Sequence, residues 1–219
     1  YHFLASTEIG GAIKNVSVLN NNINKNNFTN IIIAPVSKKE KKKKRNFLES
    51  PNPNNIFKYT LFCFFLLWKL NIKKQKTLIS THGRGCGFLV RPIAILFNFK
   101  IFHTFRGFDK NFGYQNLSLI NKLKIFFLIK IEKILSRKSL CICVSKSELQ
   151  AVKKNLEIKK AFLIYNPAIE FKFRKNIKKK IDFLIVGRRS YQKGYDIFLD
   201  LMTQRPLLNI HWLGDKKKD

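Results

Sequence analysis

The chain has 219 residues, of which 45% are hydrophobic, and 43 Lys and Arg against 13 Asp and Glu give a formal net charge of +30. The apolar content is ample for a buried core, so the composition excludes an unfolded chain, and the length allows one large domain or one domain with part of another. The charge is typical of proteins that bind nucleic acid or anionic membranes. However, Lys, Asn, Ile and Phe are abundant together and share A/T-rich codons, so a genomic bias explains much of the lysine excess.

The four cysteines do not have the CxxC pairing of metal sites, and three of them lie in apolar segments. We therefore expect buried, reduced thiols, a cytoplasmic protein and no bound metal. These cysteines are Cys63, Cys86, Cys141 and Cys143.

The first elements alternate between strand and helix. His2–Ala5 is predicted to be a strand, apolar residues recur at helical spacing from Ala12 to Ile23, and Thr29–Ala34 is predicted to be a second strand. Between the first strand and the helix stand Gly10 and Gly11, which permit close approach of the backbone to a ligand or simply a tight turn. From these residues alone the turn is favoured.

A charge block, Lys38–Arg45, follows the second strand and is itself followed by the proline-rich Ser50–Pro53. Neither segment can pack in a core, so we predict a loop. The block is expected to be solvated, with contact to anionic lipid as the alternative, where each basic residue contributes about 1 kcal/mol.

Asn55–Leu70 is predicted to be a helix, and its very apolar part, Tyr59–Trp68, spans ten residues. A membrane-spanning helix needs about 20 apolar residues, so a core helix is the favoured interpretation and an interfacial helix the alternative.

The predicted strand Thr77–His82 runs into the glycine-rich sequence THGRGCG, at the carboxyl end where open α/β sheets bind ligands. The next helix, Phe88–Asn98, contains Pro92 and is therefore expected to be kinked or to begin late.

Phe99–Phe105 is predicted to be the next strand, and Arg106 follows it. His103 is three residues before Arg106, so the two face opposite sides, and a buried structural imidazole is expected at His103. An arginine can bind a phosphate or carboxylate but cannot shuttle a proton near neutral pH.

The middle of the chain continues the alternation. Ser145 and Glu148 have the S-x-x-E spacing of a capping box, so a helix is predicted to begin there. The other predicted elements are the helix Leu117–Leu135, the strands Leu140–Val144 and Ala161–Tyr165, and the charged segment Lys172–Lys180 that crosses into a second domain.

The last segment predicts one βαβ unit. Ile181–Val186 is apolar except for Asp182, as in a strand buried on both faces of a parallel sheet. A helix is predicted from Tyr195, and Leu208–Leu213 is predicted to be the second strand.

Between the strand and the helix of this unit lie three cations, Arg188, Arg189 and Lys193. A helix N-terminus offers free N–H groups and the positive end of the helix dipole, so cations beside it can form a phosphate site. The alternative is an ordinary solvated loop in a very basic protein.

The loop of this unit resembles the donor-site motif of the retaining glycosyltransferases of family 4 (group 1), which have the GT-B fold. The resemblance lies in the sequence V-G-R, followed after four residues by K-G and by a helix that starts with an aromatic, an acidic and an apolar residue. In that family the arginine and lysine of the motif hold the diphosphate of a nucleotide sugar. The resemblance assigns this role to Arg188 and Lys193.

Other strings resemble the same family in the same order. IGGAIKNVSVL resembles its GGA loop, which approaches substrate phosphates in the interdomain cleft and would contain Gly10 and Gly11. The family commonly has a His-Gly after the strand that ends here in His82 and Gly83, so these would line the cleft. IFHTFRG resembles its strand ending in Thr-x-His-Gly, but Arg106 stands where the family has its cleft histidine, so the catalytic residue is left unassigned.

The resemblance implies an α/β protein of the GT-B type. Residues 1–166 would form a Rossmann-like, parallel-sheet acceptor domain, residues 167–180 a linker after Asn166 and Pro167, and residues 181–219 an incomplete donor domain. A complete donor domain needs more than about 100 residues, and the family's glutamate pair for the ribose and sugar is absent. We therefore expect the chain as given not to catalyse transfer.

The implied reaction is transfer of a sugar, with retention, from a nucleotide-diphosphate sugar to a lipid-linked or polysaccharide acceptor of the cell envelope. It needs no cofactor or metal, because Arg188 and Lys193 would neutralise the leaving diphosphate. A peripheral position at the inner face of the cell membrane is a further expectation.

Two other functions stay open. One is a nucleic-acid-binding protein, although the basic residues are spread along the chain and no nucleic-acid-binding signature is present, so no nucleic acid partner is expected. The other is an inactive remnant that docks on membranes.

Overall fold

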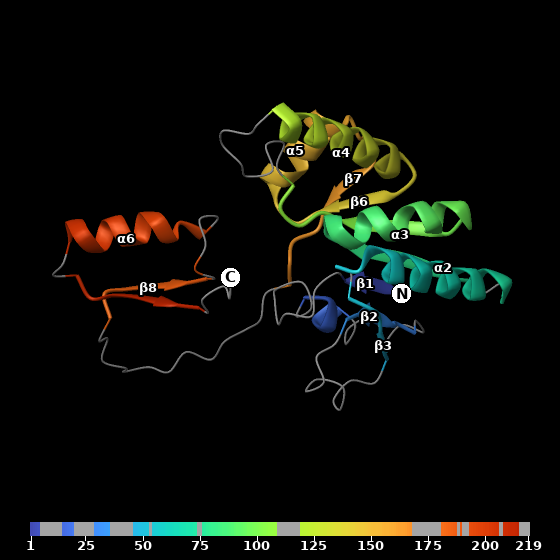
Figure 1. Cartoon of the computed structure of the whole chain (residues 1–219), viewed down its shortest axis with the longest axis horizontal. Coiled ribbons are helices and arrows are strands. Elements are labelled where there is room, and N and C mark those ends of the chain that lie inside the picture. The colour runs from blue at the N-terminus through green and yellow to red at the C-terminus, as the bar shows by residue number, and fades with distance from the viewer. Residues whose placement is uncertain are drawn as a thin grey trace. The chain divides into compact units, whose positions relative to one another are not determined.

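The computed structural model describes residues 1–4, 15–19, 29–35, 46–52, 54–73, 76–108, 119–167, 181–187, 189, 193–205 and 208–214 (Figure 1). The chain forms two compact units, Tyr1–Ala168 and Ile169–Asp219.

The first unit contains a seven-stranded sheet in which every neighbouring pair is parallel. The strand order is β3-β2-β1-β4-β5-β6-β7. The strands are β1 (His2–Leu4), β2 (Ile32–Ala34), β3 (Phe47–Glu49), β4 (Leu78–His82), β5 (Lys100–Thr104), β6 (Leu140–Cys143) and β7 (Ala161–Leu163). This arrangement confirms the predicted α/β class with a Rossmann-like parallel sheet.

The strand order reverses between β1 and β4. From β1 the chain moves outward to β2 and β3, and then returns to β4 on the other side of β1. In an open α/β sheet, ligands bind at the carboxyl ends of the strands beside such a switch point. Register pairs Leu4 with His82 there, so the ends of β1 and β4 are adjacent.

Four helices form one layer against the sheet: α2 (Ile56–Ile72), α3 (Arg84–Leu96), α4 (Leu119–Arg137) and α5 (Lys146–Leu156). Each lies in a connection that advances towards β7, and right-handed crossovers place such helices on the same face. Contacts between α2 and α3, α3 and α4, and α4 and α5 agree (Figure 1). The short helix of residues 15–19 lies between β1 and β2, in a connection that runs away from β7. A right-handed crossover in this direction places the helix on the other face of the sheet.

The core follows the alternation of the strands. Phe3, Ile33 and Ile79 face the helix layer and pack with α2 and α3, which contribute Tyr59, Cys63, Leu67, Cys86, Val90 and Ala94. Leu4 and Ile32 form a smaller cluster with Val16 of the short helix. All four cysteines are free and buried, as predicted.

One sequence prediction for this unit was wrong, and one strand was missed. Helix α3 begins at Arg84 rather than Phe88 and includes Pro92. Gly83, at φ 79°, caps the helix without a side-chain bond, and Pro92 is on the exposed side, where water can bond the carbonyl that has lost its N–H partner. The short strand β3 was missed, because three residues beside a charge block carry little periodic signal.

Helix α2 is half core and half surface. It buries Tyr59, Cys63 and Leu67, as expected for a core helix, but exposes Phe65 and Trp68 on its opposite side. In the part of the chain that the structure describes, no helix is long and apolar enough to span a membrane.

The second unit is the predicted βαβ arrangement: β8 (Phe183–Val186), α6 (Tyr195–Gln204) and β9 (Ile210–Leu213), with β8 parallel to β9. The expectation that β8 is buried on both faces was wrong, because Phe183 and Val186 are 57% and 71% exposed. Two described strands and one helix cannot cover both faces of this sheet.

Candidate functional site

The best candidate site of the first unit is the carboxyl edge of its sheet at the switch point. His82 is the last residue of β4, and Gly83 links it to α3 and donates its N–H to the carbonyl of Thr104 at 2.9 Å. No side chain caps the first turn of α3. The positive end of this helix therefore faces the edge where the strands end.

The imidazole of His82 is held by one neighbour on the adjacent strand β1 and one on its own strand. It stacks on His2 with ring centroids 5.5 Å apart, and its Nε2 lies 3.3 Å from Nδ1 of His2 and 3.2 Å from Oγ of Ser80. Its Nδ1 is buried and has no hydrogen-bond partner among the described residues. Burial lowers the pKa of His82 well below its usual value, with His2 and Arg106 adding to the effect. A neutral ring can exchange hydrogen bonds with a ligand without adding charge.

Two guanidinium groups lie near this edge. Arg106 lies two residues after the end of β5. It is close enough to His82 to lower the pKa of that ring. Its own pKa is lowered by burial, an effect that Glu148 opposes. Arg84, in the first turn of α3, donates from Nη2 to the carbonyl of Gly107 at 3.4 Å and lies 5.3 Å from the ring centroid of Phe108. Together with the start of α3, these groups suit an anionic ligand.

Glu148 organises the loops behind this edge. Its Oε1 accepts the N–H groups of Gly107 (2.6 Å) and Phe108 (2.9 Å), and its Oε2 accepts that of Val144 (2.8 Å). One carboxylate thus joins the loop after β5 to the loop after β6. A cavity of about 480 Å³ lies beside it, lined by Gly107, Phe108, Val144, Ser145, Ser147, Glu148, Ala151 and Asn155.

The sequence indicated only half of this arrangement. Ser145 does cap α5, since its Oγ accepts the N–H of Glu148 at 3.2 Å. The reciprocal bond of a capping box, however, goes to Val144 and the loop after β5. The S-x-x-E spacing was the available signal, but it contains nothing about the distant loop.

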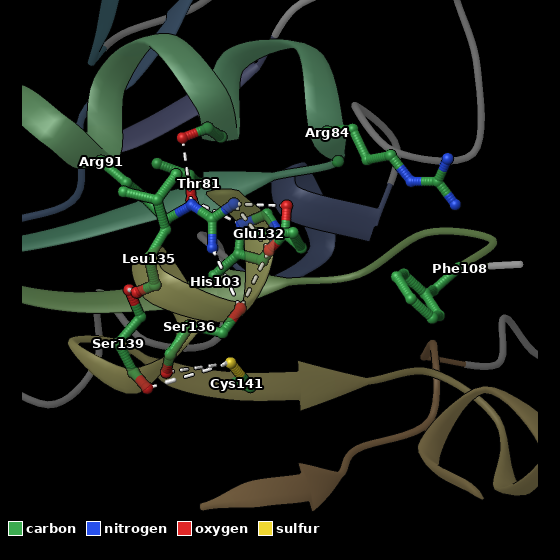
Figure 2. A network of polar contacts seen from close by, with 12 residues as sticks. Thr81, Arg84, Arg91, His103, Phe108, Glu132, Leu135, Ser136, Ser139 and Cys141 are labelled. Atoms are coloured by element: carbon green, nitrogen blue, oxygen red, sulfur yellow. Dashed lines mark hydrogen bonds and ion pairs between the residues drawn. The ribbon is translucent and has the colours of Figure 1, made fainter. Parts of the chain in front are cut away.

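A second polar cluster, between α3, α4 and the sheet, is structural (Figure 2). Arg91 donates to Glu132, and Oγ of Ser136 donates to Oε1 of Glu132 at 2.9 Å. His103 is fully buried, as predicted, with Nδ1 2.8 Å from Oγ1 of Thr81. The cluster is sealed from solvent, so it holds α3 and α4 together rather than meeting a ligand.

The second unit has its own candidate site, between β8 and α6. A Cβ added at Gly187 would lie 3.6 Å from Cγ of Lys193, so the lysine side chain lies against the end of β8. Nε1 of Trp212 donates to the carbonyl of Gly187 at 2.6 Å and fixes that end. Gly194, at φ 72°, caps α6 without a side-chain bond.

Arg189 lies near the ring of Tyr195, with Cζ 5.8 Å from its centroid. Its Nε has no hydrogen-bond partner within the described ranges. Arg188, Gly10 and Gly11 lie outside the described residues. Of the predicted site residues, the structure brings His82, Gly83 and Arg106 to one edge of the first unit and places Lys193 in the second. Within the described part of the chain, no three His, Cys, Asp or Glu are grouped to hold a metal ion.

No protein-family profile and no curated protein matches the chain in sequence. Solved structures do match. Over its whole length the chain is similar to a MnaA–UDP co-structure from S. aureus, with a TM-score of 0.64 and 11% identity, covering 61% of that chain. Over its whole length it is also similar to a putative UDP-N-acetylglucosamine 2-epimerase from Listeria monocytogenes, with a TM-score of 0.59 and 10% identity, covering 62% of that chain. It is also similar, again over its whole length, to a glycosyltransferase from Rickettsia africae ESF-5, with a TM-score of 0.58 and 15% identity, covering 68% of that chain.

The chain therefore spans about three fifths of the length of the first two proteins. At these identities the likeness shows the fold alone. That fold is α/β of the GT-B type, which confirms the predicted fold class.

Proposed function

We propose that the protein is a GT-B glycosyltransferase, or the part of one, that transfers a sugar from a nucleotide-diphosphate donor to a lipid-linked or polysaccharide acceptor with retention. The observation that carries this proposal is the site between β8 and α6, where Lys193 lies against Gly187 at a helix N-terminus without a side-chain cap. The motif resemblance to family 4 adds Arg188 to this site.

In this proposal the second unit binds the diphosphate. Lys193 supplies a point charge, and the first turn of α6 supplies N–H groups and the positive end of the helix dipole. As the bond to the sugar breaks, negative charge builds on the leaving diphosphate, and fixed positive groups stabilise it most at that moment. The step requires no metal.

The carboxyl edge of the first unit is proposed to bind the acceptor side of the reaction. His82, Arg84 and Arg106 lie where β4 and β5 end, which is where the fold class places ligands. A phosphate of a lipid-linked acceptor is an anion that the two guanidinium groups would hold. Gly10 and Gly11 are proposed instead to approach the diphosphate of the donor, as the resemblance to family 4 implies.

Calorimetric titration with UDP, in a form of the protein that has a complete donor domain, tests the donor site. Lys193→Ala and Arg188→Ala are each expected to weaken binding roughly tenfold to a hundredfold, because a charge-assisted hydrogen bond contributes about 1.5–3 kcal/mol. Arg205→Ala, at the opposite end of α6, is the matched control and should bind UDP as the parent does. Equal binding by all three variants, or a larger loss for Arg189→Ala, would overturn the residue assignment.

A second candidate function is epimerisation of a UDP-sugar. It is considered because two of the similar structures are a UDP complex and a putative UDP-N-acetylglucosamine 2-epimerase. In a form of the protein that has a complete donor domain, incubation with UDP-N-acetylglucosamine, without any acceptor, separates the two reactions. An epimeric UDP-sugar in the chromatogram would support epimerisation. A requirement for an added acceptor before UDP is released would support transfer.

A further inference from the structure

Helix α2 is apolar on both sides, although only one side packs on the protein core. Tyr59, Cys63, Leu67 and Leu70 form its buried stripe. The opposite stripe repeats at helical spacing and is open to solvent. It consists of Phe57, Leu61, Phe64, Phe65, Trp68 and Ile72, which are 38–74% exposed.

Helix α4 buries two polar side chains beside Leu135 and exposes an apolar stripe. Its buried side carries Glu132 and Ser136, which bond with Arg91, whereas its outer side is apolar. The exposed residues again repeat at helical spacing. They are Leu119, Ile120, Leu123, Phe126, Phe127, Ile131 and Ile134, which are 45–74% exposed.

The exposed charges that α2 and α4 themselves carry are all positive, and Glu157 at the end of α5 pairs with one of them, Lys133. Helix α2 contains lysines and no acidic residue, and the single acid of α4 is Glu132, which is buried. Lys58 and Lys69 border the stripe of α2, and Lys122, Lys124 and Lys130 lie in or beside that of α4. Nζ of Lys130 lies 4.5 Å from the ring centroid of Phe126, so cationic and aromatic groups are interleaved on this surface.

The two stripes belong to the same helix layer. Both helices contact α3, which lies between them, and the right-handed crossovers place all three on one face of the sheet. Because both stripes lie opposite their buried sides, both point away from the sheet. Monomeric proteins rarely leave apolar surface of this extent uncovered, so a partner is implied.

We propose that the outer faces of α2 and α4 form one docking surface for an anionic lipid bilayer, with the apolar side chains in the headgroup boundary and the lysines at the lipid charges. A membrane surface is the partner that is both apolar and negative. A second copy of the chain fits less well, since each copy brings a net charge of +30 and more lysine to the same contact. The inference extends the proposed function, since a lipid-linked acceptor lies in the membrane, but it does not use the donor site.

The tryptophans provide a direct readout, because the chain has two of them, Trp68 and Trp212, and Trp68 lies in the proposed surface. In a Trp212→Phe background, emission comes from Trp68 alone. Vesicles of phosphatidylglycerol with phosphatidylcholine should shift this emission to the blue, and bromine-labelled acyl chains should quench it. Vesicles of phosphatidylcholine alone should do so more weakly.

Two double variants separate the apolar and ionic parts of the surface. Phe65→Gln with Phe127→Gln should weaken partitioning into anionic vesicles by about tenfold or more. Lys69→Gln with Lys124→Gln should weaken it by about fivefold per lysine and leave neutral vesicles unaffected. The matched control is Phe162→Gln with Ile164→Gln, which removes two residues that are 53% and 56% exposed outside the two stripes.

These measurements use neither nucleotide nor acceptor, so failure of the membrane surface is distinguishable from failure of the donor site. The proposal is overturned if Trp68 emission does not respond to anionic vesicles. It is also overturned if the control lowers partitioning as much as the Phe65 and Phe127 variant does. A concentration-dependent dimer that this variant dissociates, without vesicle binding by the parent, would assign the surface to self-association instead.

Discussion

Nη2 of Arg91 lies 2.7 Å from both carboxylate oxygens of Glu132, and both side chains are almost completely buried. This pair joins α3 to α4 in an interior where neither charge can be solvated. Removing one partner leaves the other charge buried and unpaired, which is more costly than never having had the pair.

Glu132→Gln is therefore expected to lower the free energy of unfolding by about 3–5 kcal/mol, whereas Arg91→Met combined with Glu132→Leu should restore most of it. Urea unfolding followed by circular dichroism measures both variants. Glu157→Gln, which removes the exposed ion pair with Lys133, serves as a control and should leave the unfolding midpoint unchanged. A single variant as stable as the parent would contradict the structural role of the pair.

Gly87 of α3 is expected to be intolerant of a side chain. An added Cβ would lie 2.7 Å from Cε1 of His103, and the His103 ring is held by Thr81 at 2.8 Å. Gly87→Ala should cost about 1–3 kcal/mol of stability despite the better helix propensity of alanine. Gly85→Ala, in the same helix but exposed, should instead stabilise by up to about 1 kcal/mol. Thermal unfolding of the two variants checks the opposite signs, and an equal gain in both would show that the His103 ring moves aside.

Stability should fall as the pH is lowered from 7.5 to 5.5. Burial lowers the pKa of His82 and His103 well below the usual value, and that of His2 to about 4. Unfolded histidines take up protons below about pH 6.5, while these three stay neutral in the folded state. Below this pH the unfolded state binds more protons than the folded state. The contribution of each buried histidine to the free energy of unfolding is therefore fully present above about pH 6.5, and below it is lost at up to about 1.4 kcal/mol per pH unit.

Urea midpoints at several pH values measure this loss. His103→Gln should reduce the slope of the free energy of unfolding against pH. A stability that does not change between pH 7.5 and 5.5 would contradict the burial of these rings.

The cysteines are expected to be unreactive in the folded protein. Burial raises the pKa of Cys86 and Cys141 to about 11 and that of Cys63 and Cys143 to about 12. At pH 8 hardly any thiolate is present, and the thiolate is the nucleophile. A colourimetric thiol reagent should therefore label none within minutes in buffer and all four in guanidinium chloride. Rapid labelling of one thiol without denaturant would identify a cysteine that opens to solvent.

The strands at the centre of the sheet were predictable for two reasons. β6 is apolar throughout, and β4 and β5 carry β-branched or aromatic residues ahead of glycine-containing turns. The start of α3 was not predictable, because three glycines within five residues read as a loop, and the cap depends on the positive φ of Gly83. The partners of His82 and Glu148 were also beyond sequence patterns. His2 and Gly107 lie 80 and 41 residues from them, and only strand register and loop packing bring them together.

The position of β1 between β2 and β4 has a consequence for how the protein is made. As the chain leaves the ribosome, β1, β2 and β3 can pair at once, but the other edge of β1 must wait until Leu78–His82 has been synthesised. Until then β1 presents unpaired N–H and C=O groups along a hydrophobic strand, which is a site for mispairing. Synthesis of α2 and β4 therefore sets the period during which the nascent chain depends on chaperones, and slow translation of this segment should increase aggregation more than slow translation after β7.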